Sequence, residues 1–444
     1  MSPEQSESSS SFSRSLRTRS QADSIWPQPF VEALAREVAL AAVNGGGSLA
    51  AVTAVVSVFQ VCSTWRTISH SEILWEALTR HVWDRTQART QSWRDEYIRL
   101  HLTASNFRHN RATYTSIEYE VSSDSDSNGA GAACRCLALS PEYLAVDFFD
   151  GALRVFSLEG KECVCTMKPN HENRLGPLSR AVAGIVMYGN TVVFASFDGN
   201  VFVGNVLTGH FRCASLGNVV NDGTLVDFTG CGRFWVGLCA GSPGHAYHIW
   251  DAATEQLVLN DGDITDLEAL RGWRLLTEQG GRIGRVGINS NGILLTATKM
   301  KLAAFDLETY GVSFSREQTA VVGQELIVES VEANNDRFLT ASNNGAARIR
   351  RITDFEDVCS FSFDTAAGDN NGNNHGERKV LGTLNAWQAF LCIDGVVHAW
   401  DAHSGLRLHR LNEHMGQVFD LVADDGHVAG CAIDSGVHLW SFRP

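Results

Sequence analysis

The sequence has no excess of basic residues. Its 36 lysines and arginines are outnumbered by 50 aspartates and glutamates, which gives a formal net charge of -14. Broad binding to nucleic-acid phosphates depends on clustered Lys and Arg side chains that release counterions. We therefore expect no direct binding to nucleic acid.

Signs of secretion are also missing. No N-terminal apolar segment resembles a signal peptide, and the eleven cysteines are an odd number without a regular framework. We therefore expect a reducing compartment, either the nucleus or the cytosol. The C-x-C pairs Cys134 with Cys136 and Cys163 with Cys165 have closer spacing than structural zinc sites usually show, so we interpret them as small apolar residues.

No uninterrupted apolar run is suited to crossing a membrane. Residues 38–62 are long and apolar, but Gly45, Gly46 and Gly47 interrupt them, and polar residues recur in the second half. The pattern predicts two short amphipathic helices joined by a glycine loop. We expect no membrane association.

Motifs for catalysis or cofactor binding are absent as well. The sequence contains no HExxH, no nucleophile elbow and no Walker motif, and residues 280–287 (GGRIGRVG) lack a surrounding Rossmann unit. His245 and His248 are three residues apart on a predicted strand, so we expect them on opposite faces and unable to share a metal. We predict no catalytic residue, no metal and no cofactor, as is usual for a binding protein.

The N-terminal quarter of the sequence is predicted to be helical after a disordered Ser-rich tail at residues 1–24. Residues 25–110 form the helical domain and its linker helix, with Phe30, Leu34 and Val38 at helical spacing in the first helix. Ser69 followed by Glu72 matches a capping box, which predicts that another helix starts there.

Beyond residue 110 the apolar period changes to two. Seven hairpin units can be counted, most with a turn glycine, and the turn glycines are 41 to 50 residues apart except for one gap of 101 that spans two units. This period is typical of propeller blades. The turn glycines are Gly151, Gly199, Gly244, Gly345, Gly395 and Gly436, and the rings expected to pack between blades are Phe156, Trp250, Phe305, Trp400 and Trp440.

The last unit ends one strand short of a four-stranded blade. Residues 112–121 alternate well enough to supply the missing strand, which would close the ring without an unpaired edge. The sequence thus predicts a mainly β protein: a WD40-like β-propeller of about seven blades at residues 111–444, preceded by a small all-α domain.

The helical segment resembles an F-box, whose usual ending is a Val-Cys-x-x-Trp helix followed by Leu-Trp. Trp26-Pro27 stands where Leu-Pro is commoner, and a Gly-rich insertion lengthens the first loop. The resemblance implies binding to a Skp-type adaptor and a cullin. The residues to which it assigns adaptor binding are Pro27, Pro29, Phe30, Leu34, Val38, Val61, Cys62, Trp65, Ile68, Leu74 and Trp75.

The similarity extends to the long segment at residues 220–251 (VNDGTLVDFTGCGRFWVGLCAGSPGHAYHIWD). This segment resembles the Sterile apetala type of plant regulator. The resemblance implies a nuclear protein of floral and organ development that marks transcriptional repressors for ubiquitination. The alternative is a transcriptional scaffold that joins a DNA-bound factor and a corepressor.

Substrate is expected at the end of the propeller where the loops entering each first strand and the intra-blade turns gather. Polar or large residues at these loops are candidates for recognition. The predicted substrate-binding residues are Arg180, Asn221, Asp222, Trp273 and Arg348.

Overall fold

The computed structural model divides the chain into two compact units, residues 1–101 and residues 102–444. The predicted boundary was near residue 110. The predicted tail lies outside the described residues. Those residues are 26–117, 134–148, 151–170, 175–176, 178–262, 271–277, 283–298, 301–309, 314–319, 330–334, 336–342, 345–363, 380–432 and 436–444.

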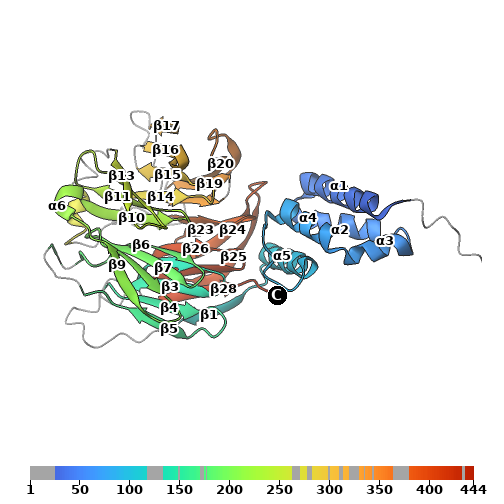
Figure 1. Cartoon of the computed structure of the whole chain (residues 1–444), viewed down its shortest axis with the longest axis horizontal. Helices are drawn as coiled ribbons and strands as arrows, with labels where there is room; N and C mark the ends of the chain where they lie inside the picture. The colour runs from blue at the N-terminus through green and yellow to red at the C-terminus, as the bar shows by residue number, and fades with distance from the viewer. Residues whose placement is uncertain are drawn as a thin grey trace, which may run out of the picture. The chain divides into compact units, whose positions relative to one another are not determined.

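The first unit is helical (Figure 1). The predicted glycine loop between the first two helices is a single residue, Gly47, with φ of 76°. The first helix therefore continues through Gly45 and Gly46. None of the helices in the described ranges has both the length and the apolar content that a membrane crossing requires. The helices are α1 Gln28–Gly46, α2 Ser48–Phe59, α3 Ser63–Thr67, η2 Ile68–His70, α4 Glu72–Trp83 and α5 Trp93–Arg108, and α5 crosses the boundary between the units.

The face of α1 that is buried in the core of the helical unit differs from the predicted face. Val31, Ala35 and Ala39 are fully buried, whereas Phe30 is 46% exposed. Residues four apart lie on one face of a helix, and each predicted residue precedes a buried residue by one position in the sequence. Phe30 and the half-buried Leu34 and Val38 therefore border the core instead of forming its centre.

The predicted capping box is wrong by two residues. Ser71, not Ser69, is the N-cap of α4, and its hydroxyl accepts a hydrogen bond from the Leu74 amide at 3.3 Å. Ser69 instead belongs to η2 and donates to the Arg66 carbonyl. The Glu72 carboxylate accepts from the Trp93 amide at 2.8 Å, which ties α4 to the start of α5.

The second unit is a seven-bladed β-propeller, which confirms the predicted architecture (Figure 1). Each blade is a four-stranded antiparallel sheet. From the inner to the outer strand, blade 1 is β2 Cys134–Leu139, β3 Tyr143–Phe148, β4 Leu153–Ser157 and β5 Cys163–Met167; blade 2 is β6 Val182–Tyr188, β7 Thr191–Ser196, β8 Val201–Asn205 and β9 Phe211–Ser215; blade 3 is β10 Thr224–Gly230, β11 Phe234–Ala240, β12 Tyr247–Asp251 and β13 Leu257–Asp261; blade 4 is β14 Gly284–Ile288, β15 Ile293–Thr298, β16 Lys301–Asp306 and β17 Phe314–Thr319.

The remaining blades complete the ring. They are blade 5, with β18 Ser330–Asn334, β19 Arg337–Ser342, β20 Ala346–Arg351 and β21 Asp357–Ser362; blade 6, with β22 Leu381–Leu384, β23 Gln388–Ile393, β24 Val396–Asp401 and β25 Arg407–His414; and blade 7, with β26 Val418–Ala423, β27 His427–Ala432, β28 Gly436–Ser441 and β1 Thr113–Ile117. Each inner strand contacts the inner strand of the next blade, and β26 contacts β2.

Blade 7 closes the ring with strands from both ends of the propeller sequence. β1 pairs antiparallel with β28, with Thr113 opposite Ser441 and Ile117 opposite Val437. Residues 118–121 of the predicted strand lie outside the described residues. Just before β1, the Phe107 ring stacks on Phe442 with centroids 3.9 Å apart, so the last turns of α5 belong to the propeller unit.

The predicted turn glycines and inter-blade rings are confirmed. The glycines occupy the left-handed region that a tight hairpin requires, with φ between 75° and 87° at Gly151, Gly199, Gly244, Gly345, Gly395 and Gly436. Each ring packs on the preceding blade of the circle; Trp250 lies in one core cluster with blade 2, and Trp440 lies in one with blade 6.

Candidate functional site

The first candidate surface lies on the helical unit, where several large apolar side chains are exposed. The exposed fraction is 50% for Trp26, 63% for Val61 and 73% for Ile73, in addition to 46% for Phe30. The rings of Trp26 and Phe30 stack with centroids 4.6 Å apart. An exposed aromatic pair is suited to binding another protein, because large rings bury much area at little entropic cost.

A hydrogen bond brings the starts of α1 and α4 together. The Ser71 hydroxyl donates to the Glu32 carboxylate at 2.7 Å, and the Gln28 amide donates to the same oxygen at 2.8 Å. Phe30 and Ile73 are therefore exposed on the first turns of two neighbouring helices.

The predicted adaptor-binding residues fall into two groups. Ile68, Leu74 and Trp75 are at most 5% exposed and form the core of the helical unit. The Trp75 ring contacts Phe59 and Tyr97, and its indole nitrogen donates to the Ser69 carbonyl at 2.7 Å. Residues with surface available for contact are Pro27, Pro29, Phe30 and Val61, which are exposed, and Leu34, Val38, Cys62 and Trp65, which are half-buried.

The second candidate surface is the end of the propeller that carries the connections into the inner strands. Arg180 lies in the β5–β6 connection, Asn221 and Asp222 lie in the β9–β10 connection, and Trp273 lies in the β13–β14 connection. Arg348 does not lie in a loop, contrary to the prediction, whereas its role in substrate binding stays a prediction. It lies within β20, opposite Thr340, and its side chain pairs with Asp357 at 3.6 Å.

Blade 3 brings part of this second surface together. The short helix α6 (Val219–Asp222) packs on the end of β11: a Cβ on Gly223 would lie 2.5 Å from the Ala240 carbonyl oxygen. The Trp273 indole donates to the Gly241 carbonyl at 3.3 Å. Val220 is 72% exposed and Trp273 is 37% exposed, so this end of blade 3 offers apolar area beside the polar Asn221.

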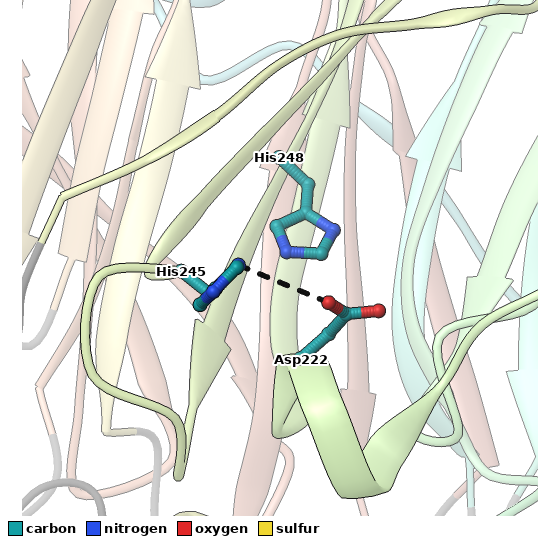
Figure 2. Close-up of side chains that lie close together, drawn as sticks. All are labelled: Asp222, His245 and His248. Atoms are coloured by element: carbon teal, nitrogen blue, oxygen red, sulfur yellow. Dashed lines mark ion pairs between the residues drawn. The ribbon is translucent and has the colours of Figure 1, made fainter.

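The predicted separation of His245 and His248 is wrong. His245 lies in the turn before β12, so the alternation of side chains along a strand does not apply to it. Asp222, His245 and His248 converge, and one potential ligand atom from each lies within 4.8 Å of the others (Figure 2). Burial lowers the pKa of His248, and the Asp222 carboxylate offsets this only in part.

A buried ion network between inner strands was not predicted. Arg285 of β14 reaches Asp227 of β10 at 3.5 Å and Asp420 of β26 at 3.8 Å, and all three side chains are at most 12% exposed. Asp227 also accepts from the Val286 amide and Asp420 accepts from the Leu137 amide. The strand register shifts at both aspartates, which periodicity alone does not reveal.

Comparison with known proteins identifies the family. No model of a known protein family matches the chain. The chain is 40% identical over 431 residues to the transcriptional regulator STERILE APETALA of Arabidopsis thaliana, and the match covers 96% of this chain and 94% of that protein. Such identity over nearly the whole of both sequences establishes that this chain belongs to the STERILE APETALA family.

Proposed function

We propose that the chain is an F-box substrate receptor of a Skp-type adaptor and cullin ubiquitin ligase, and that it binds transcriptional repressors through its propeller. The exposed apolar side chains of the helical unit carry this proposal. Phe30 and Val61 are exposed apolar residues within the segment that resembles an F-box. Binding would remove this apolar area from water, which stabilises a complex by roughly 25 cal/mol per Å² of gross burial before the costs of association.

The propeller holds the substrate in this proposal. The connections at the end of blade 3 place Val220, Asn221 and Trp273 on an exposed surface, and a repressor protein binds there or on the neighbouring blades. The receptor contributes proximity between substrate and ubiquitin-carrying enzyme and has no active site of its own. It works in the nucleus, where its repressor substrates act, and it does not contact nucleic acid directly.

Co-purification from plant cells tests the proposal with variants that leave the core intact. The double variant Phe30→Asp, Val61→Asp places charge on the exposed residues, and Ile98→Asp, which is 39% exposed on α5 and outside the predicted adaptor set, is the matched control. We expect adaptor and cullin with the wild type and the control but not with the double variant. Recovery of adaptor and cullin with the double variant would contradict the proposed surface.

A second function is favoured by the name of the relative, which describes a transcriptional regulator. In that alternative the propeller is a scaffold that joins a transcription factor to a corepressor, and no ligase is involved. The same co-purification separates the two functions. A corepressor recovered with the wild type in the absence of both adaptor and cullin would favour the scaffold.

A further inference from the structure

Two histidines and one aspartate meet at the blade 3 end of the propeller, although they come from separate connections. Asp222 ends α6 in the β9–β10 connection, His245 lies in the β11–β12 turn, and His248 is the second residue of β12. Their side chains face one another in Figure 2. His245 Nδ1 lies 3.9 Å from Asp222 Oδ1, which is too long for a hydrogen bond.

The imidazole of His248 is buried without a complete set of partners. His248 is 5% exposed, and its Nε2 makes no hydrogen bond within the described residues. Buried polar atoms are nearly always paired, so an unpaired ring nitrogen that faces a carboxylate and a second imidazole calls for an explanation. His245 Nδ1 likewise has no hydrogen-bond partner among the residues that the structure describes.

We infer that Asp222, His245 and His248 form a zinc(II) site. Two imidazole nitrogens and one carboxylate oxygen are ordinary zinc ligands, and a water or a side chain of a bound protein would complete a tetrahedron. Ligands at about 2.1 Å from zinc lie about 3.4 Å apart, so the present separations of up to 4.8 Å require a modest movement. His245 can supply that movement because it lies in a turn and its side chain is 43% exposed.

Zinc would fasten α6 to the β11–β12 turn and so stiffen the exposed surface of Val220 and Asn221. The site is independent of whether the chain joins a ligase. Three protein ligands leave the fourth position of a tetrahedral zinc ion for a water molecule or for a ligand from a bound protein.

The test uses the full chain, stripped of metal under reducing conditions and titrated with zinc(II) alone against a chromophoric chelator. The variants are Asp222→Asn, which keeps the side-chain shape, and His245→Ala, which changes a half-exposed turn residue. Asn221→Ala and His210→Ala are the controls, because both residues are exposed and lie outside the cluster. We expect one zinc ion per wild-type chain, an increase of the thermal midpoint with zinc, and affinity at least about tenfold weaker in both variants but unchanged in both controls.

Cobalt(II) distinguishes this site from the free cysteines of the chain. We expect visible bands of four-coordinate cobalt without a strong thiolate charge-transfer band, and loss of those bands in Asp222→Asn. Failure of the wild type to bind zinc, equal zinc affinity in both variants and the wild type, or a thiolate band that accompanies the bound metal would overturn the proposal. If one variant fails to fold, the other supplies the comparison.

Discussion

Apolar side chains are distributed differently in the helical unit and in the propeller. In the propeller the rings between blades are buried, and Trp250, Trp400 and Trp440 are each at most 3% exposed. In the helical unit Trp75 is 5% exposed but Trp26 is 50% exposed. Apolar periodicity therefore marks core in the propeller, whereas in the helical unit it marks core and candidate binding surface together.

The largest effect should come from removing the central ring of the helical unit. Trp75→Ala leaves a cavity between Phe59 and Tyr97 and removes the hydrogen bond to the Ser69 carbonyl. We expect a loss of about 3–5 kcal/mol in the free energy of unfolding of this unit. Hydrogen exchange on the full chain should show faster exchange in residues 28–101 and unchanged protection in the inner strands of the propeller. Unchanged protection of α4 would show that Trp75 is not a core residue.

In the propeller, the next largest loss of stability should come from removing the cation of the buried ion network between the inner strands. Arg285→Ala leaves the buried carboxylates of Asp227 and Asp420 without their shared cation, although each keeps a backbone amide donor. We expect a cost of about 3 kcal/mol, measured by chemical denaturation. Adding Asp227→Asn to this variant should recover part of the loss, because one buried charge disappears. No recovery would argue against coupling between the two residues.

Turn glycines allow a matched test of backbone crowding within the propeller. A Cβ on Gly395, with φ of 78°, would lie 2.6 Å from the Gly416 carbonyl oxygen, whereas one on Gly189, with φ of 56°, would meet nothing within 4 Å. Gly395→Ala should cost about 2–3 kcal/mol and Gly189→Ala about 1 kcal/mol in thermal unfolding. Equal losses of stability in the two variants would show that the blade 6 turn shifts to accommodate the Cβ without strain.

A buried ion pair in the helical unit predicts a pH-dependent effect. Burial would raise the pKa of Glu96, but the hydrogen bond and charge of Arg99, together with the Arg89 amide, outweigh it and lower the pKa below 4.5. The contribution of the ionised Glu96 side chain to the free energy of unfolding is therefore fully present above the unfolded-state pKa. It is lost as the pH falls through the lower folded-state pKa. Glu96→Gln should cost about 1–3 kcal/mol at pH 7. The difference from wild type should shrink below about pH 4.5; a constant difference would contradict the assignment.

The smallest effect on stability should come from the exposed residues of the helical unit. Phe30→Asp with Val61→Asp should change the free energy of unfolding by no more than about 0.5 kcal/mol, because both side chains already contact water. Thermal unfolding beside Ile98→Asp checks this. A large loss of stability would place Phe30 or Val61 in the core and remove them from the candidate surface.

Much of the propeller could be predicted from the sequence because hairpins are local. The turn glycines reveal six of the seven hairpins, and the missing strand of the last unit indicates that β1 completes blade 7. The helical unit was less predictable, because Phe30 and Val31 are adjacent apolar residues and only tertiary packing decides which one is buried. The cap at Ser71 was missed because Ser69 has Glu72 three residues later, as in a capping box, whereas Ser71 has Leu74 there.

Contacts between distant segments were also beyond the sequence patterns. Arg285 meets Asp227 and Asp420 only because the ring brings β10, β14 and β26 close together. His245 meets Asp222 because a turn, rather than a strand, carries it. Neither arrangement has a fixed spacing that a motif could detect.

The most direct test of the ligase proposal is the affinity of the purified full chain for a purified Skp-type adaptor, measured by calorimetry. The account predicts nanomolar binding by the wild type and by Ile98→Asp, and at least about a hundredfold weaker binding by the folded Phe30→Asp, Val61→Asp variant. Absence of binding by the wild type would contradict the account and favour the transcriptional scaffold.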